Sequence, residues 1–215
     1  MTFNFLNNGT SGALPGFDGQ RSNAINLFAN ASHTGSFEGT LMGNFIGRTG
    51  VAESGSDLGN GIRLSNEGAG TVTVEIDDNT IQQIQDFEGI LVIENVTAGD
   101  TAVTITNNVI DQIINDRGMN VIAEIDGGVL CANIEDNTVT NTAANPPGSP
   151  DCGLRVRQKS NATLRVERYS GGATDATAMG THLETDNPLA NSGCATVNAA
   201  FRFDTPVPDG DCRTP

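Results

Sequence analysis

The stretches IDDNTIQQI (76–84), ITNNVIDQI (105–113) and IEDNTVTNT (134–142) carry one pattern three times, and each copy begins 29 residues after the one before it. In each copy an apolar residue precedes two polar residues, an asparagine and a second short run. A repeat of this length is typical of a solenoid, in which each turn packs against its neighbours. The interval between the copies therefore decides the fold class.

A second motif recurs between the copies of the first. It is a glycine followed by an apolar, a variable and an apolar residue, and it occurs as GIRL (61–64), GILV (89–92), GMNV (118–121) and GLRV (153–156). The residues before each asparagine alternate with a period of two, so that Val72, Val74 and Ile76 share one face of a strand. Each repeat thus holds several short strands without helical periodicity.

These strands predict an all-β fold, a right-handed parallel β-helix (solenoid) of about six coils with three short strands per coil. We expect it to span residues 1–204, with 205–215 as a C-terminal tail or cap. Equivalent strands of successive coils then lie about 4.8 Å apart, so that their inward residues form columns. The predicted columns are Ile62 on Ile90, Met119 and Leu154, and Ile76 on Ile105, Ile134 and Val166.

Asparagine recurs where each strand is expected to bend. Asn79, Asn108 and Asn137 occupy this position, and Asn8 and Asn44 are candidates for the same corner. Asparagine tolerates the left-handed backbone conformation, and its amide can hydrogen-bond the backbone of the next coil. We expect these side chains to stack into a ladder of the kind seen in cross-β structures. In the following copy Tyr169 takes this position.

The copies around DNTI…GILV, NNVI…GMNV and DNTV…GLRV resemble the repeats of right-handed parallel β-helix proteins. That group includes pectate-lyase-like and polygalacturonase-like enzymes, phage tailspikes and bacterial surface or secreted repeat proteins. The resemblance covers residues 1 to about 204. It implies the fold and leaves the function open, because one coil of this kind hosts many activities.

The charge of the chain limits its partners. The formal net charge is −15, and such a surface repels nucleic-acid phosphates and anionic membranes. No apolar run approaches the roughly 20 residues that a membrane-spanning helix needs. We therefore expect no nucleic-acid partner and no membrane insertion, and a location outside the cell or on its surface.

Four cysteines can form two disulfides. Their order favours Cys131–Cys152 and Cys194–Cys212, which close loops of similar length, although four cysteines allow three pairings. The second of these bridges would close a C-terminal loop that caps the coil. Buried free thiols are the alternative, and no cysteine–histidine cluster with zinc spacing is present.

Outward carboxylates are the candidates for chemistry. An outward column is predicted to hold Asp77, Thr106, Glu135 and Glu167, beside a column of Glu75, Thr104, Asn133 and Arg165. Because Thr106 interrupts the acids, Asp77 and Glu135 lie about 10 Å apart, and no compact catalytic trio results. We assign no catalytic residue and favour a protein that is not an enzyme.

The acidic corners are candidates for weak Ca²⁺ binding, and no other cofactor is expected. The candidate ligands are Asp77, Asp78, Glu135 and Asp136.

Five basic residues cluster near the C-terminal end of this acidic chain: Arg155, Arg157, Lys159, Arg165 and Arg168. This basic band could bind an anionic glycan or the acidic surface of another copy. Local pairing with Glu167 and Asp151 is the alternative.

Apolar residues also fall on the outward face of the coil. Leu91, Ile93 and Ile122 are expected to form an adjacent exposed patch, which would be an interface. Alternatively, a segment such as 173–193 folds over the patch.

At the N-terminal end of the coil, a strand begins almost at residue 3 with no preceding cap. The N-terminal strand edge is therefore expected to be open to another subunit, unless the chain is cut from a longer coil.

These observations favour a non-catalytic, secreted or cell-surface module for structure or adhesion, which assembles with itself end to end or laterally, in oligomers or filaments. The alternative is a carbohydrate-active or glycan-binding β-helix, similar to polysaccharide lyases or hydrolases. An enzyme needs a cleft where carboxylates and a base converge, whereas a structural module needs complementary ends or patches.

Overall fold

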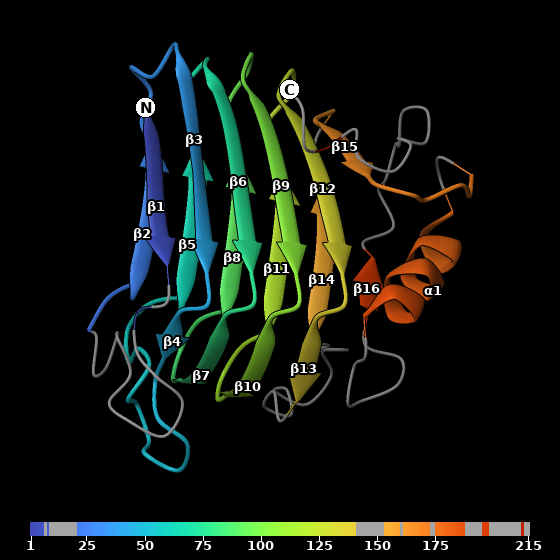
Figure 1. Ribbon diagram of the computed structural model, residues 1–215. Helices are drawn as coiled ribbons and strands as arrows, with labels where there is room; N and C mark the ends of the chain where they lie inside the picture. Colours follow the sequence, from blue (N-terminus) through green and yellow to red (C-terminus); the bar gives the residue numbers. More distant parts are fainter. Residues whose placement is uncertain are drawn as a thin grey trace.

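The computed structural model describes residues 1–6, 8, 21–140, 153–159, 161–172, 175–187, 195–197 and 212. These residues form three parallel sheets around one axis (Figure 1). The first sheet holds, in spatial order, β1 (Thr2–Leu6), β3 (Ser36–Met42), β6 (Thr71–Asp77), β9 (Asp100–Thr106), β12 (Val129–Glu135) and β15 (Thr163–Val166). The second sheet holds β4 (Phe45–Ile46), β7 (Thr80–Ile84), β10 (Val109–Ile113) and β13 (Thr138–Thr140). The third holds β2 (Ile25–Ala29), β5 (Ile62–Asn66), β8 (Ile90–Glu94), β11 (Met119–Ala123), β14 (Leu154–Gln158) and β16 (Ala195–Val197).

The coil is right-handed. In Figure 1 the strands of the first sheet run downward in front, those of the third sheet run upward behind, and successive coils advance from left to right. Each complete coil contributes one strand to each sheet, for example β6, β7 and β8. This confirms the predicted all-β parallel β-helix with three strands per coil.

Equivalent residues of successive coils lie side by side, as the repeat predicts. Ile76 pairs with Ile105, which pairs with Ile134. Ile62, Ile90, Met119 and Leu154 form the second predicted column. The side chains of both columns are buried in one continuous apolar core.

One predicted neighbour is wrong. Val166 lies beside Ala132 rather than Ile134, because β15 is shifted by two residues along β12. A two-residue shift keeps inward side chains inward, so the alternating pattern alone cannot distinguish the two registers.

The recurring glycines are required by close packing at the start of the third-sheet strands. A Cβ atom at Gly89 would lie 2.7 Å from the carbonyl oxygen of Gly118 and 2.8 Å from a methyl carbon of Ile110. Gly61 and Gly118 are crowded in the same way, each by the carbonyl oxygen of the next glycine in the column. Only glycine lets successive coils approach this closely at that corner.

The predicted asparagine ladder is present and runs the length of the coil. The Nδ2 atom of each asparagine donates to Oδ1 of the next, over distances of 2.7–2.9 Å, through Asn8, Asn44, Asn79, Asn108, Asn137 and Asn187. The same Oδ1 atoms accept the backbone N–H of the preceding asparagine. The second Nδ2 proton is also used, as where Asn108 donates to the Ile76 carbonyl oxygen at 2.8 Å. From Asn44 onward these asparagines are fully or almost fully buried, and their amides are satisfied.

The left-handed backbone conformation falls one residue earlier than predicted. Asp78, Asn107 and Asp136 have φ values of 53°, 56° and 56°, and each directly precedes a ladder asparagine. Gly43, with φ 64°, has the same place before Asn44. The bend therefore turns on the preceding residue, which leaves the asparagine side chain free to point into the coil.

A helix closes the C-terminal end of the coil, and the sequence analysis did not predict it. Helix α1 (Ala176–Asp186) stands beside β16 at the right of Figure 1. Its residues Met179 and Leu183 are fully buried in the core. Asn187, the residue at which the helix ends, forms the last step of the ladder by accepting from Asn137. No helix in the described part of the chain is long and apolar enough to cross a membrane.

The ladder predicts a large cost for removing one of its steps. Replacing Asn108 by alanine removes the acceptor of the Asn79 backbone N–H and Nδ2, and it removes the Nδ2 donor to Asn137 Oδ1. Each buried group left without its partner costs about 1–3 kcal/mol. We expect Asn108→Ala to lower the free energy of unfolding by about 3 kcal/mol or more, measured by urea denaturation. The matched Asn115→Ala removes one exposed bond to Asp86 and should change stability by less than about 0.5 kcal/mol. Equal effects of the two variants would contradict the ladder.

Candidate functional site

The outer side of the first sheet is a polar face over its first strands. Its outward residues follow the strand register, so that Thr40 lies beside Glu75, which lies beside Thr104. A shallow hollow of about 290 Å³ lies on this face, lined by Thr2, Asn4, Glu38, Gly39, Thr40, Thr73, Val74, Glu75 and Thr104. We call this the polar face. Hydroxyl, amide and carboxylate groups converge there on one surface.

The predicted outward columns are correct over three coils and differ in the next. Asp77, Thr106 and Glu135 lie side by side as predicted. The shift of β15 moves Arg165 beside Cys131. It also places Glu167 after Val166, next to Asn133, because the Glu167 N–H donates to the Ala132 carbonyl oxygen. Glu167 therefore belongs to the column of Glu75 and not to that of Asp77.

The predicted calcium ligands make contacts within the protein. Asp77 accepts hydrogen bonds from the Thr106 hydroxyl at 2.7 Å and from the Asn107 amide at 2.9 Å. Glu135 accepts from Asn133 and forms an ion pair with Arg168. Asp78 and Asp136 are the residues on which the chain bends. Within the described residues no three acidic, histidine or cysteine side chains are grouped closely enough to hold a metal ion, and calcium binding stays a prediction.

The basic band is divided between two sheets and does not form one surface. Arg155 and Arg157 lie on β14 of the third sheet, whereas Arg165 lies on β15 of the first. Lys159 forms an ion pair with Glu124, and Arg168 bridges Glu135 and Asp186. The five residues are neighbours in sequence, but the coil turns a corner between β14 and β15.

The predicted apolar patch is not exposed. Leu91 and Ile122 are buried, with 8% and 6% of their surfaces accessible, and Ile93 is partly buried. The strand alternation did place them on the outward face, opposite the core residues Val92 and Val121. This face therefore does not offer the free apolar surface that lateral association would use.

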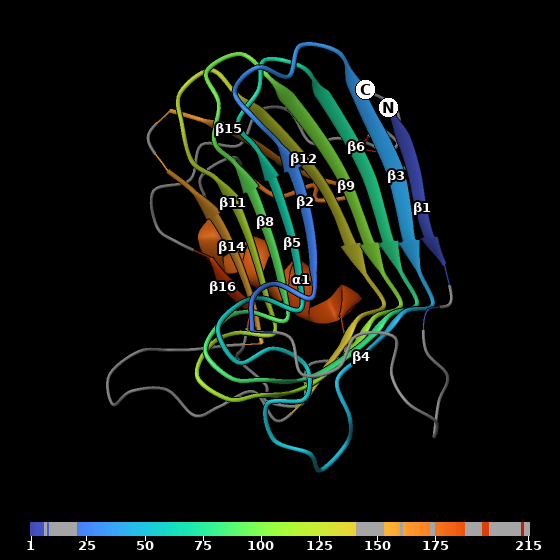
Figure 2. The same cartoon turned by 90° about the vertical axis from the view of Figure 1, so that its left-hand side faces the viewer.

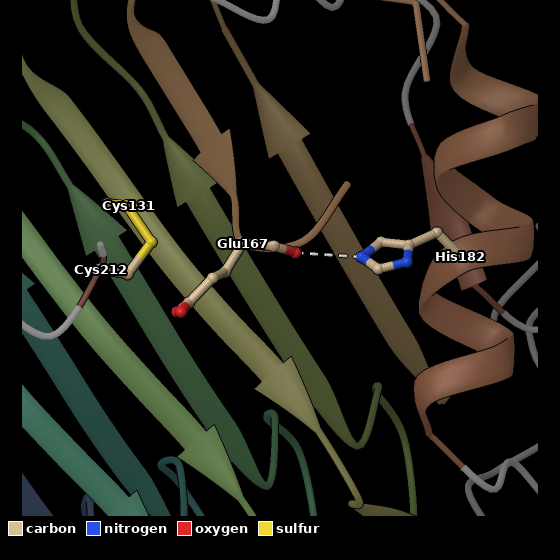
Figure 3. Close-up of a disulfide and its surroundings, with 4 residues drawn as sticks. All are labelled: Cys131, Glu167, His182 and Cys212. Atoms are coloured by element: carbon tan, nitrogen blue, oxygen red, sulfur yellow. Dashed lines mark hydrogen bonds between the residues drawn. A yellow bond between two sulfur atoms is a disulfide. The ribbon is translucent and has the colours of Figure 1, made fainter. Parts of the chain in front are cut away.

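A disulfide joins Cys131 to Cys212, and this pairing differs from the one that the cysteine order favoured. The two Cα atoms are 5.3 Å apart across 81 residues of sequence. Cys131 points outward from β12, so the bond fixes the buried Cys212 on the outer side of the first sheet (Figure 3). Cys152 and Cys194 lie outside the described residues. Similar loop lengths wrongly favoured pairing between cysteines that are neighbours in the sequence, because the coil brings residues together across several turns.

His182 links α1 to the end of the coil. Its Nε2 atom lies 3.1 Å from the carbonyl oxygen of Glu167 and donates to it, since a carbonyl oxygen only accepts (Figure 3). The Glu167 side chain points away from α1, on the side of the disulfide (Figure 3). This hydrogen bond holds α1 against the end of the coil. Among the residues drawn in Figure 3, none is a nucleophile in contact with His182.

Two buried acids were missed by the sequence analysis. Glu94 at the end of β8 is fully buried, and burial raises its pKa to about 8 against hydrogen bonds from Thr101 and Asn66. Burial, followed by the charge of Asp116, raises the pKa of Glu88, which accepts from Asn120 at 2.6 Å. Neither acid stands in a recognisable motif. The one sequence signal that pointed to a buried Glu94 was Asn66, a polar residue at the equivalent inward position of the preceding coil.

The N-terminal end of the coil carries an apolar pocket of about 440 Å³. Its lining is Met1, Phe3, Phe5, Ala24, Ile25, Asn26, Leu27, Phe28 and Phe37, and we call it the end pocket. Phe3 packs against Phe37 with ring centroids 5.1 Å apart, while Phe5 and Phe28 are 41% and 44% exposed. Figure 2 looks onto this end, with β1 and β2 nearest the viewer.

The end pocket is where the sequence analysis expected an open strand edge. β1 and β2 are the outermost strands of the first and third sheets, and no described strand pairs with their far edges. The apolar lining was not foreseen, because its four phenylalanines come from three different strands and meet only at this end.

Comparisons of this chain with protein-family models, with curated proteins and with solved structures find no match.

Glu94 predicts a pH dependence of stability. Its folded pKa of about 8 lies above the ordinary value of 4.5, so the unfolded chain loses this proton first as pH rises. The contribution of Glu94 to stability is therefore fully present below pH 4.5 and is lost between pH 4.5 and 8, by on the order of 5 kcal/mol. We expect Glu94→Gln to match the wild type in urea unfolding at pH 4 and to exceed it at pH 8. The exposed Glu75→Gln serves as control, and a gap that is constant with pH would contradict the assignment.

Proposed function

We propose that this protein is a non-catalytic structural module, secreted or at the cell surface, that works by associating with other copies through its N-terminal end. The end pocket carries this proposal. An unpaired strand edge is a template for another strand, and exposed apolar surface beside it favours association because burial removes that surface from water.

The chemistry of the end pocket supports contact between like molecules. Its lining side chains are all uncharged, although the chain as a whole carries a net charge of −15. Two copies that approach through other surfaces bring acidic groups together, which is unfavourable. Approach through the N-terminal ends keeps most of that charge apart.

The two ends of the coil differ, and this difference limits the assembly. The C-terminal end carries α1, with Met179 and Leu183 buried against the core. Coil-on-coil stacking of the N-terminal end of one copy on the C-terminal end of the next would have to displace this helix. The proposal is therefore a discrete oligomer rather than an end-to-end filament.

The disulfide supports the proposed location. Cys131–Cys212 is of a kind that persists in oxidising compartments and is rare in the reducing cytosol. The high negative charge is compatible with solubility outside the cell.

Association predicts a concentration-dependent molecular mass that depends on the end pocket. Sedimentation velocity across micromolar concentrations should detect oligomers of the wild-type protein. Phe28→Lys places a charge in the pocket and should give monomers. Phe87→Lys is the matched control, because Phe87 is 42% exposed against 44% for Phe28 and does not line the pocket. A wild-type protein that remains monomeric throughout would end the proposal.

A second candidate function is glycan binding on the polar face. The hollow there places threonine hydroxyls beside Asn4, Glu38 and Glu75, and such groups can hydrogen-bond sugar hydroxyls. Isothermal titration with neutral and acidic oligosaccharides tests it. Glu75→Gln should weaken binding by at least about threefold, and Glu53→Gln on a distant loop should not. Release of new sugar ends during the titration would instead favour a carbohydrate-active enzyme.

A further inference from the structure

The direction of the backbone groups on β1 defines how a second copy can dock, and this inference rests on the function proposed above. The Met1 carbonyl oxygen accepts from the Glu38 N–H at 2.8 Å, so Met1 faces β3. Backbone groups alternate between the two edges of a strand. Phe3 and Phe5 therefore also face β3, whereas the N–H and C=O groups of Thr2, Asn4 and Leu6 face the far edge, where no described strand lies.

The same reasoning applies to β2 on the opposite sheet. The Ile25 N–H donates to the Gly61 carbonyl oxygen at 2.9 Å, so the backbone groups of Asn26 and Phe28 face away from β5. Both edge strands thus turn hydrogen-bonding groups toward edges with which no described strand pairs, at the same end of the coil, and the side chains of both line the end pocket. Any partner must satisfy two strand edges and cover the apolar surface between them.

We infer that the partner is a second copy of this chain, joined N-terminal end to N-terminal end about a two-fold axis, with β1 antiparallel to β1 of the copy. A head-to-tail partner would present its C-terminal end, and α1 occupies that end. The N-terminal end of a second copy presents the same free edges and the same apolar surface, which a two-fold axis makes self-complementary.

The register of this pairing follows from the free groups. A two-fold axis through Asn4 places Asn4 opposite Asn4 of the second copy and Thr2 opposite Leu6 of the second copy. All three residues that face the free edge then form hydrogen-bonded antiparallel pairs, with facing Cα atoms about 5.5 Å apart. The two first sheets become one continuous sheet, and Phe3 lies opposite Phe5 of the second copy. Because the contact is isologous, it closes at two copies.

Proline at position 4 tests the backbone pairing. The Asn4 N–H faces away from β3, toward an edge with which no described strand pairs, so Asn4→Pro removes a donor that the inferred β1 pairing needs. The outer edge of an edge strand is a place where sheets tolerate proline. We expect Asn4→Pro to sediment as a monomer with an unfolding temperature within a few degrees of the wild type. Asn4→Ala keeps the N–H and should stay dimeric. A dimeric Asn4→Pro protein would overturn the β1 pairing.

A cysteine at position 4 tests the register independently. Facing Cα atoms about 5.5 Å apart are within disulfide range, so Asn4→Cys should give a covalent dimer under mild oxidation on a non-reducing gel. Thr40→Cys lies on the same face one strand further in and should not, and wild-type protein controls for the native cysteines. Absence of the Asn4→Cys cross-link, or open-ended polymers in solution, would overturn the two-fold arrangement.

The outcomes separate this inference from the proposed function. If the wild type associates and Phe28→Lys abolishes association while Asn4→Pro does not, the end pocket is an interface but β1 pairing is wrong. If the wild type never associates, both fail together.

Discussion

The stacking of asparagine amides at one corner of the coil is the interaction on which the rest of the structure depends. Each amide in the interior of the ladder donates to the coil ahead and to a backbone carbonyl behind, and each Oδ1 accepts twice. The corner backbone is buried, where an unpaired polar group costs about 1–3 kcal/mol. The ladder removes that cost from every coil at once and fixes each coil at one height above the last. The register of β3, β6, β9 and β12, whose coils each supply an asparagine to the ladder, is held in this way.

The two ends of the ladder are treated differently, and this asymmetry links the fold to the proposed function. At the C-terminal end Asn187 supplies the final acceptor from the end of a helix, and Met179 and Leu183 cover the core. At the N-terminal end no described strand pairs with the outer edges of β1 and β2, and phenylalanines line the space between the sheets. Under the proposed function this difference favours pairing over polymerisation, because the end that α1 covers does not offer its core to a second copy.

Buried polar groups show that the fold also carries a cost. Glu94 is buried with a raised pKa, and burial also raises the pKa of Glu88 in a network that includes Asn120 and Arg155. Such groups do not contribute to stability as apolar residues would. They lie where strands meet corners, and the half-buried Arg155 faces Asn120 there with a pKa lowered mainly by its own burial. No described cluster among them has the ligand set of a metal site.

The sequence by itself determined the coil, because a repeat stacks each residue on its own equivalent: Ile76 on Ile105 and Ile134, and the asparagines on one another. Alternation also assigned Leu91 and Ile122 to the outward face. Only the tertiary structure decided what lies outside the repeat, including α1, the last ladder step at Asn187, the Cys131–Cys212 bond, the burial of Leu91 and the division of the basic band. These depend on which segments meet in space after several turns of the coil, and that proximity is not encoded in any local period. The open, phenylalanine-lined end belongs to the same class, since its residues are far apart in sequence and converge only when the coil has formed.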